Sequence, residues 1–168
     1  MQVSALQSIK IFGLWDQPRK IVTWDDLKSL ELSWRVLRTD YKFSAQDLKK
    51  IQPDKSEWVA RGGIQLSDLP EMTIFPVNPF IDLKRDLAEV WAMSWPVELL
   101  VEMGVTFDQL KSRGMNTAIM RVVNLPLKSW VQLKMQPHHI ESEEDSAIFD
   151  LSMAECKQIL QDFGSLNK

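Results

Sequence analysis

An apolar residue recurs every ten positions between residues 94 and 140, and a second apolar residue follows five positions after each one. The first series is Trp95, Val105, Met115, Leu125 and Met135, and the second is Leu100, Leu110, Met120, Trp130 and Ile140. A fixed period is typical of stacked units, each too small to bury its apolar face alone. The pattern therefore predicts a repeat architecture for residues 94–140.

Each ten-residue unit carries its own signals for starting and ending a helix. A helix-capping residue, such as Thr106 or Asn116, directly follows the first apolar residue. That apolar residue can pack back on the first turn as a hydrophobic staple. Gly104, Gly114 and Asn124 follow earlier units, where a left-handed residue closes a helix well. Each unit should therefore form about two helical turns and a sharp corner.

One continuous helix over the same residues is the competing prediction. It is disfavoured by Gly104, Gly114, Pro126 and Pro137, because a proline inside a helix costs roughly 3 kcal/mol. Isolated helices as short as these are marginal in water. The units should therefore be stabilised by packing on their neighbours.

The same pattern appears in residues 22–51 and again near the end of the chain. Each copy has an apolar residue, then Ser or Thr, then an apolar or small buried residue five positions after the first. The copies are Val22-Thr23 with Leu27, Leu32-Ser33 with Leu37, Phe43-Ser44 with Leu48, and Leu151-Ser152 with Cys156. We therefore expect short-helix repeats at 22–51, decapeptide helical repeats at 94–140, and a final helix from Ser152 to Phe163 that ends at Gly164.

Residues 52–93 lack this period and predict a connector followed by a long helix. Residues 73–78 should be extended, because Pro76 and Pro79 each disfavour helix in the residue before them. Asn78 then caps a helix with proline at its first position, and this helix should run to about Met93. It would be the longest helix, lying between the two repeat blocks.

These elements predict an all-α fold: a stack of short capped helices around one longer helix, in a single domain over residues 1–168. Residues 1–21 form an N-terminal arm or a small β-hairpin in this prediction. Residues 141–168 form an acidic loop, at 141–146, and the C-terminal helix.

Composition and charge narrow the class of protein. The net charge is −3, with 18 basic and 16 acidic residues in 1–134 but two basic and seven acidic residues in 135–168. Nucleic-acid binding usually needs a clustered basic face, so this charge distribution is weak evidence for a nucleic-acid-binding protein. The single cysteine excludes a disulfide framework within the chain, and no long apolar stretch predicts a signal peptide or membrane span. We expect an intracellular or virion protein that is not secreted.

No residue set in the sequence predicts an active site. His138 and His139 are adjacent with acidic residues nearby, but the spacing lacks a metal-binding motif, so we interpret them as a solvated polar corner. Cys156 occupies the buried apolar position of its repeat, which favours a core role over a nucleophile. We therefore predict no enzyme activity, no metal and no cofactor.

Basic residues recur across the decapeptide block and form the alternative candidate site. Lys111, Arg113, Arg121 and Lys128, together with Lys134, could line one edge of the stack and contact phosphates. The competing interpretation is a charged outer face, which any such stack needs. A nucleic-acid-binding helical module is thus the second hypothesis for function.

The runs Met-Gly-Val-Thr-Phe-Asp-Gln-Leu at 103–110, Gly-Met-Asn at 114–116 and Asn-Leu-Pro-Leu-Lys-Ser-Trp at 124–130 carry a resemblance. They resemble short-helix repeats of uncharacterised proteins of large nucleocytoplasmic DNA viruses, over roughly residues 93–140 and faintly over 22–50. The resemblance implies a component of a virion or virus factory and transfers no functional residue.

The first hypothesis is therefore a non-enzymatic structural or protein–protein interaction protein, a minor component of a capsid or other large assembly. Its partners would be other protein chains, with no membrane span. The extended segments 1–20 and 73–80 would act as bridging arms, with Trp15 and Phe75 as exposed partner-binding anchors.

Overall fold

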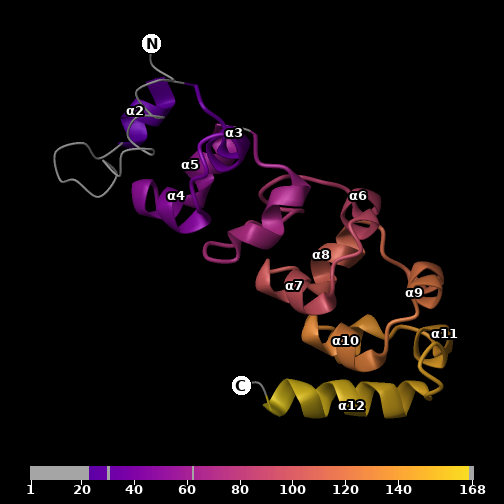
Figure 1. Ribbon diagram of the computed structural model, residues 1–168. Coiled ribbons are helices and arrows are strands. Elements are labelled where there is room, and N and C mark those ends of the chain that lie inside the picture. Colours follow the sequence, from indigo (N-terminus) through magenta and orange to yellow (C-terminus); the bar gives the residue numbers. More distant parts are fainter. Residues whose placement is uncertain (1–22, 30, 62, 167–168) are drawn as a thin grey trace. The chain divides into compact units, whose positions relative to one another are not determined.

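The computed structural model describes residues 23–29, 31–61 and 63–166, and every regular element within them is a helix (Figure 1). The predicted all-α fold of short helices is confirmed. The arm or hairpin predicted for residues 1–21 lies outside the described residues. The chain divides into two compact units, Met1–Val77 and Asn78–Lys168. The single domain over residues 1–168 stays a prediction.

The described part of the first unit consists of short helices that begin at the predicted caps. The hydroxyl oxygens of Thr23, Ser33 and Ser44 each accept a hydrogen bond from the backbone N–H three residues later, at 3.2, 3.3 and 3.1 Å. The repeats at 22–51 therefore form three capped helices. The helices of this unit are α2 (Trp24–Ser29), α3 (Trp34–Thr39), α4 (Ala45–Ile51), α5 (Lys55–Ala60) and the 3₁₀ helix η2 (Leu66–Met72).

Tryptophan side chains form the centre of the first unit. Trp58 is fully buried in α5, and its ring lies edge-on to Trp24 at 4.5 Å and to Trp34 at 5.4 Å. The indole N–H of Trp58 donates to the backbone carbonyl of Gln52 at 2.9 Å. The second apolar residue of each repeat completes this core: Leu27, Leu37 and Leu48 are all 0% exposed.

The second unit contains the decapeptide repeats and the longest described helix, α12, which has 14 residues. Figure 1 shows α7 to α10 as a succession of short helices at sharp corners, followed by α11 and α12. The helices are α6 (Leu87–Ala92), α7 (Val97–Glu102), α8 (Phe107–Ser112), α9 (Thr117–Val123), α10 (Leu127–Gln132), the 3₁₀ helix η3 (Pro137–His139), α11 (Glu143–Ala147) and α12 (Met153–Leu166).

A four-residue joint explains the ten-residue period. Six helical residues in α7 are followed by the C-cap Met103, the left-handed Gly104, the apolar Val105 and the N-cap Thr106 of α8. The N–H of Val105 donates to the carbonyl of Leu100 at 2.9 Å, as in a Schellman motif. Val105 thus closes one helix and precedes the cap of the next, which is why an apolar residue is needed there.

The same joint geometry recurs along the array. Equivalent bonds run from Met115 to Leu110 and from Met135 to Trp130, both at 3.0 Å. Left-handed residues occur at every tenth position, with φ of 54° at Ser94, 76° at Gly104, 99° at Gly114, 54° at Asn124 and 64° at Lys134. The predicted closures at Gly104, Gly114 and Asn124 are confirmed. Sequence reasoning missed Ser94 and Lys134, because neither is a residue type that favours positive φ.

Replacing Thr106 by alanine should lower the free energy of unfolding by about 1 kcal/mol, the typical cost of a lost N-cap. The Thr106 hydroxyl accepts from the N–H of Gln109 at 3.4 Å, and the Gln109 side chain accepts from the N–H of Thr106. Urea unfolding followed by circular dichroism measures the change. Thr106→Ser, which keeps the hydroxyl, should unfold like wild type; equal stability of the alanine variant would show that the cap contributes nothing.

The long helix predicted from Asn78 to about Met93 is wrong. Asn78 does begin a turn, because its Oδ1 accepts from the N–H of Phe80 at 2.9 Å. That turn ends before Lys84, which has a left-handed φ of 53°. Asp86 then caps a new helix, α6, in a reciprocal capping box with Glu89 at 2.8 and 3.1 Å. The second cap signal overrides the continuous apolar pattern, so the segment holds one turn and one short helix.

Two details of the C-terminal prediction also need correction. The segment 141–146, predicted as an acidic loop, is largely helix α11, since Asp145 Oδ2 accepts the N–H groups of Glu141 and Ser142 at 2.9 Å each. Helix α12 continues through Gly164 to Leu166, and Phe163 is 42% exposed where a buried residue was predicted. The helix therefore extends beyond the residues that bury it.

Candidate functional site

Of the two aromatic anchors predicted to bind partners, the structure describes only Phe75. Trp15 lies outside the described residues. Phe75 is only 7% exposed and packs edge-on against Trp34 at 5.7 Å, so it belongs to the core of the first unit. Val77 in the first unit and Phe80 in the second are buried as well. Segment 73–80 is therefore not a free bridging arm, because the side chains of Phe75, Val77 and Phe80 are buried by packing within the protein.

The four basic residues predicted to contact phosphates divide into two classes. Lys111 pairs with Glu141 at 2.6 Å, and Arg113 donates to the backbone carbonyl of Phe80 at 2.8 Å. These two side chains therefore hold separate segments of the second unit together. Arg121 and Lys128 are exposed, and no ion pair involves them within the described residues. Two of the four residues predicted to contact phosphates therefore already have partners within the protein.

The two histidines differ in burial: His138 is exposed, as the interpretation as a solvated corner predicts, whereas His139 is buried, which corrects that interpretation for this residue. His139 is 5% exposed, and its ring lies 4.7 Å from that of Phe107. Its Nδ1 accepts the backbone N–H of Gln136 at 2.8 Å, and its Nε2 lies 2.6 Å from Asp108 Oδ1. Because Nδ1 accepts a hydrogen bond, it carries no proton. The hydrogen-bond pattern therefore assigns the neutral tautomer of His139, in which Nε2–H donates to Asp108.

This arrangement has the right atoms for a metal but an unfavourable tautomer. Ligand atoms of Asp108, His138 and His139 lie within 4.8 Å of one another. A metal at His139 Nε2 would require the proton on Nδ1, where it would oppose the N–H of Gln136. Because both ring nitrogens of His139 are engaged in these hydrogen bonds, neither is available as a general base. The geometry favours a structural pair that joins η3 to α8.

The single cysteine is in the core, as its repeat position predicts. Cys156 is 0% exposed in α12. Burial raises the pKa of its thiol, and the negative charge of Asp145 raises that pKa further. Both effects disfavour the thiolate, which is the reactive form.

Asp145 itself anchors α11. Partial burial acts to raise the pKa of its carboxyl group, but hydrogen bonds from the Thr117 hydroxyl and from the N–H groups of Glu141 and Ser142 outweigh burial and lower it. Asp145 is therefore held as a carboxylate that connects α9 to the start of α11.

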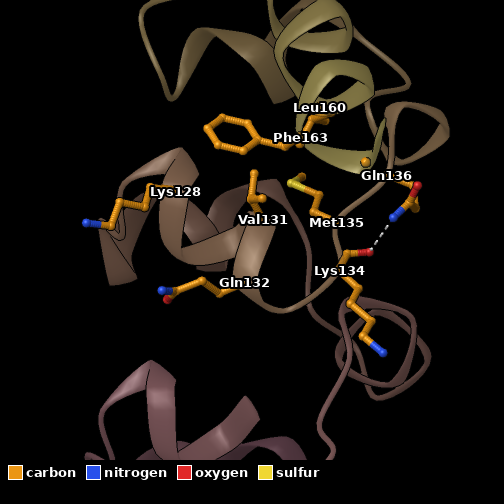
Figure 2. Close-up of a pocket in the computed structure, with 9 residues that line it drawn as sticks. Lys128, Val131, Gln132, Lys134, Met135, Gln136, Leu160 and Phe163 are labelled. Atoms are coloured by element: carbon orange, nitrogen blue, oxygen red, sulfur yellow. Dashed lines mark hydrogen bonds between the residues drawn. The ribbon is translucent and has the colours of Figure 1, made fainter. Parts of the chain in front are cut away.

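An apolar groove remains open between α10 and α12. Figure 2 shows Leu160 and Phe163 pointing from α12 toward Val131 of α10 and toward Met135, which follows it. The hollow has a volume of about 610 Å³. Leu160 is 2% and Met135 3% exposed, so they form the floor, whereas Phe163 is open to solvent.

Cationic side chains border this groove. Lys128 and Lys134 both line it, and neither takes part in an ion pair among the described residues. Figure 2 shows their ammonium groups directed away from the apolar walls. Lys128 was predicted as a binding residue, but the groove was not. The sequence pointed to the groove only through the apolar face of α12, formed by Cys156, Leu160 and Phe163. The spacing of these residues does not show which of them a neighbouring segment covers.

None of the described helices is long and apolar enough to cross a membrane. Comparison with known proteins adds no further constraint: no protein family matches this sequence, and no significant match was found among curated proteins or solved structures.

Proposed function

We propose that this chain is a non-enzymatic protein–protein interaction protein that works within a larger assembly. The observation that carries the proposal is the apolar groove between α10 and α12, with Phe163 exposed at its wall. Exposing an aromatic side chain beside an open apolar hollow leaves transfer free energy that a partner can recover by covering it.

The state of the reactive side chains supports a role without chemistry. His139 has both ring nitrogens engaged, by Gln136 and by Asp108. Cys156 is fully buried with a raised thiol pKa. Groups of these types act in catalysis when they are accessible and aligned with a base or substrate. Here His139 and Cys156 stabilise the fold, which supports a role that depends on surface shape.

We propose a virion as the assembly, because the repeats resemble those of large DNA virus proteins. A nucleic-acid-binding module is the alternative, since Arg121 and Lys128 are exposed. That alternative is weakened because Lys111 and Arg113 already contact protein groups. Titration with DNA and RNA at low salt distinguishes the two proposals. Binding of either nucleic acid, with an affinity that falls as the salt concentration rises, would favour the nucleic-acid-binding module.

Site-specific photo-crosslinking tests the proposal in the native source. A photoreactive amino acid at Gln132, which lines the groove, should give defined covalent adducts to protein chains. The matched control is the same amino acid at Val122 on α9, which is 87% exposed and outside the groove lining. Adducts from position 132 alone support the proposal. No adducts from 132, or the same adducts from both positions, would contradict a role for the groove.

A further inference from the structure

The surface around the groove offers a projection as well as a recess. Leu160 is the last buried residue of α12, yet the helix continues to Leu166. Phe163 and Leu166 are 42% and 79% exposed on this extension. Six further helical residues extend a helix by about 9 Å. The extension is therefore an apolar ridge that begins at the wall of the groove itself.

The two sides of this surface also carry opposite charges. Lys128 and Lys134 line the groove beside α10 without an ion pair among the described residues. On α12, Asp162 precedes Phe163, and its carboxylate accepts a hydrogen bond from the neutral amide of Gln158 at 2.8 Å. The groove thus has two lysines in its lining, and the ridge has a carboxylate at the residue next to Phe163.

We propose that the groove is occupied by the α12 extension of a second copy of this chain, in a reciprocal two-fold dimer. A two-fold interface places the same patch of both copies in contact, so each patch must complement itself. This one can, because the ridge with Asp162 of one copy meets the groove with Lys128 and Lys134 of the other. The inference rests on the proposed function and names the partner for its groove.

Sedimentation velocity of the full chain, from low micromolar to several hundred micromolar, tests the dimer. Wild type should pass from monomer to dimer as concentration rises. Phe163→Glu should raise the dissociation constant at least about tenfold, because it places a carboxylate in the apolar contact. Val122→Glu also replaces an exposed apolar residue and should dimerise like wild type. Circular dichroism checks that both variants keep their helices.

A charge exchange tests the two-fold pairing. Asp162→Lys alone and Lys128→Glu with Lys134→Glu alone should each weaken dimerisation, since each places like charges opposite one another. An equimolar mixture of the two variants should dimerise again, because all charges are then complementary in the mixed dimer. Restoration in the mixture supports the proposal.

Three results would overturn it: wild type that stays monomeric at the highest concentration, a Phe163→Glu variant that dimerises normally, or a mixture that associates no better than its components. Crosslinking at Gln132 separates this outcome from failure of the proposed function. A monomeric chain that still gives adducts with different proteins in the source retains an interaction role without self-association.

Discussion

Replacing Trp58 by alanine should lower the free energy of unfolding by about 4 kcal/mol, because a fully buried tryptophan leaves a cavity that neighbouring side chains fill only in part. The indole is enclosed by Trp24 and Trp34 and bonds to the Gln52 carbonyl. Since a domain has only about 5–15 kcal/mol of stability, this loss is a large share of it. Urea unfolding followed by circular dichroism measures the change.

Phenylalanine at two tryptophan positions provides the control for this prediction. Both Trp58 and Trp34 are 0% exposed, but the indole N–H of Trp34 has no partner within the described residues. Trp58→Phe should therefore cost more than Trp34→Phe by about 1 kcal/mol, because only the first removes a hydrogen bond, the one to the partly buried carbonyl of Gln52. If the two variants are equally stable, the bond to Gln52 makes no net contribution.

Replacing Gly63 by alanine should lower the free energy of unfolding by about 2–3 kcal/mol, from a clash added to backbone strain. Gly63 has a φ of 85°, and a Cβ there would lie 2.5 Å from the Cβ of Ser33. Ser33 caps α3 through its hydroxyl, so it cannot move away without loosening that helix. Thermal or urea unfolding of the variant measures the loss.

Gly114 offers a matched control in which only the strain is present. Its φ is 99°, and nothing lies within 4 Å of a Cβ built there. Gly114→Ala should therefore cost about 1 kcal/mol, the penalty of a left-handed backbone for an L-residue. The difference between the two variants measures the clash with Ser33. Equal losses at both positions would show that Ser33 shifts freely and that the close approach is unimportant.

The starts of the short helices could be predicted because they depend on interactions between residues close together in the sequence. Ser44, which follows the apolar residue of its repeat as the predicted caps do, begins α4 and forms a reciprocal capping box with Asp47, three residues later. Thr106 with Gln109 behaves in the same way. Hydrogen bonds of this range depend on neighbouring residues alone, so short-helix starts could be placed from the sequence. The ten-residue period then followed from caps and apolar positions together.

The long helix was mispredicted because two local signals competed. Apolar spacing after Asn78 favours a continuous helix, whereas Asp86 with Glu89 favours a new start. Nothing in the spacing ranks one above the other, and the left-handed turn at Lys84 settles the competition in favour of the second cap.

The candidate site, by contrast, depends on contacts between residues that are far apart in the sequence. Such contacts cannot be predicted from the spacing of residues in a single sequence. His139 contacts Asp108, 31 positions away in the sequence, and this contact gives the histidine a structural role that its position in the sequence does not indicate. Phe163 continues the helical face of Cys156 and Leu160, which are 0% and 2% exposed, yet it is itself 42% exposed. The spacing of apolar residues along α12 places all three on one face, but which of them a neighbouring segment covers depends on tertiary packing.

The joint between helices also constrains how such a gene can change. Every corner of the array is closed by its own left-handed residue and opened by its own N-cap, so one decapeptide is a complete part. Gaining or losing a whole ten-codon block would preserve the local hydrogen bonds that close one helix and cap the next. An insertion of one or two codons would instead separate Val105 from the cap it precedes. Natural variants should therefore differ in length by whole blocks, and smaller insertions should accumulate elsewhere in the chain.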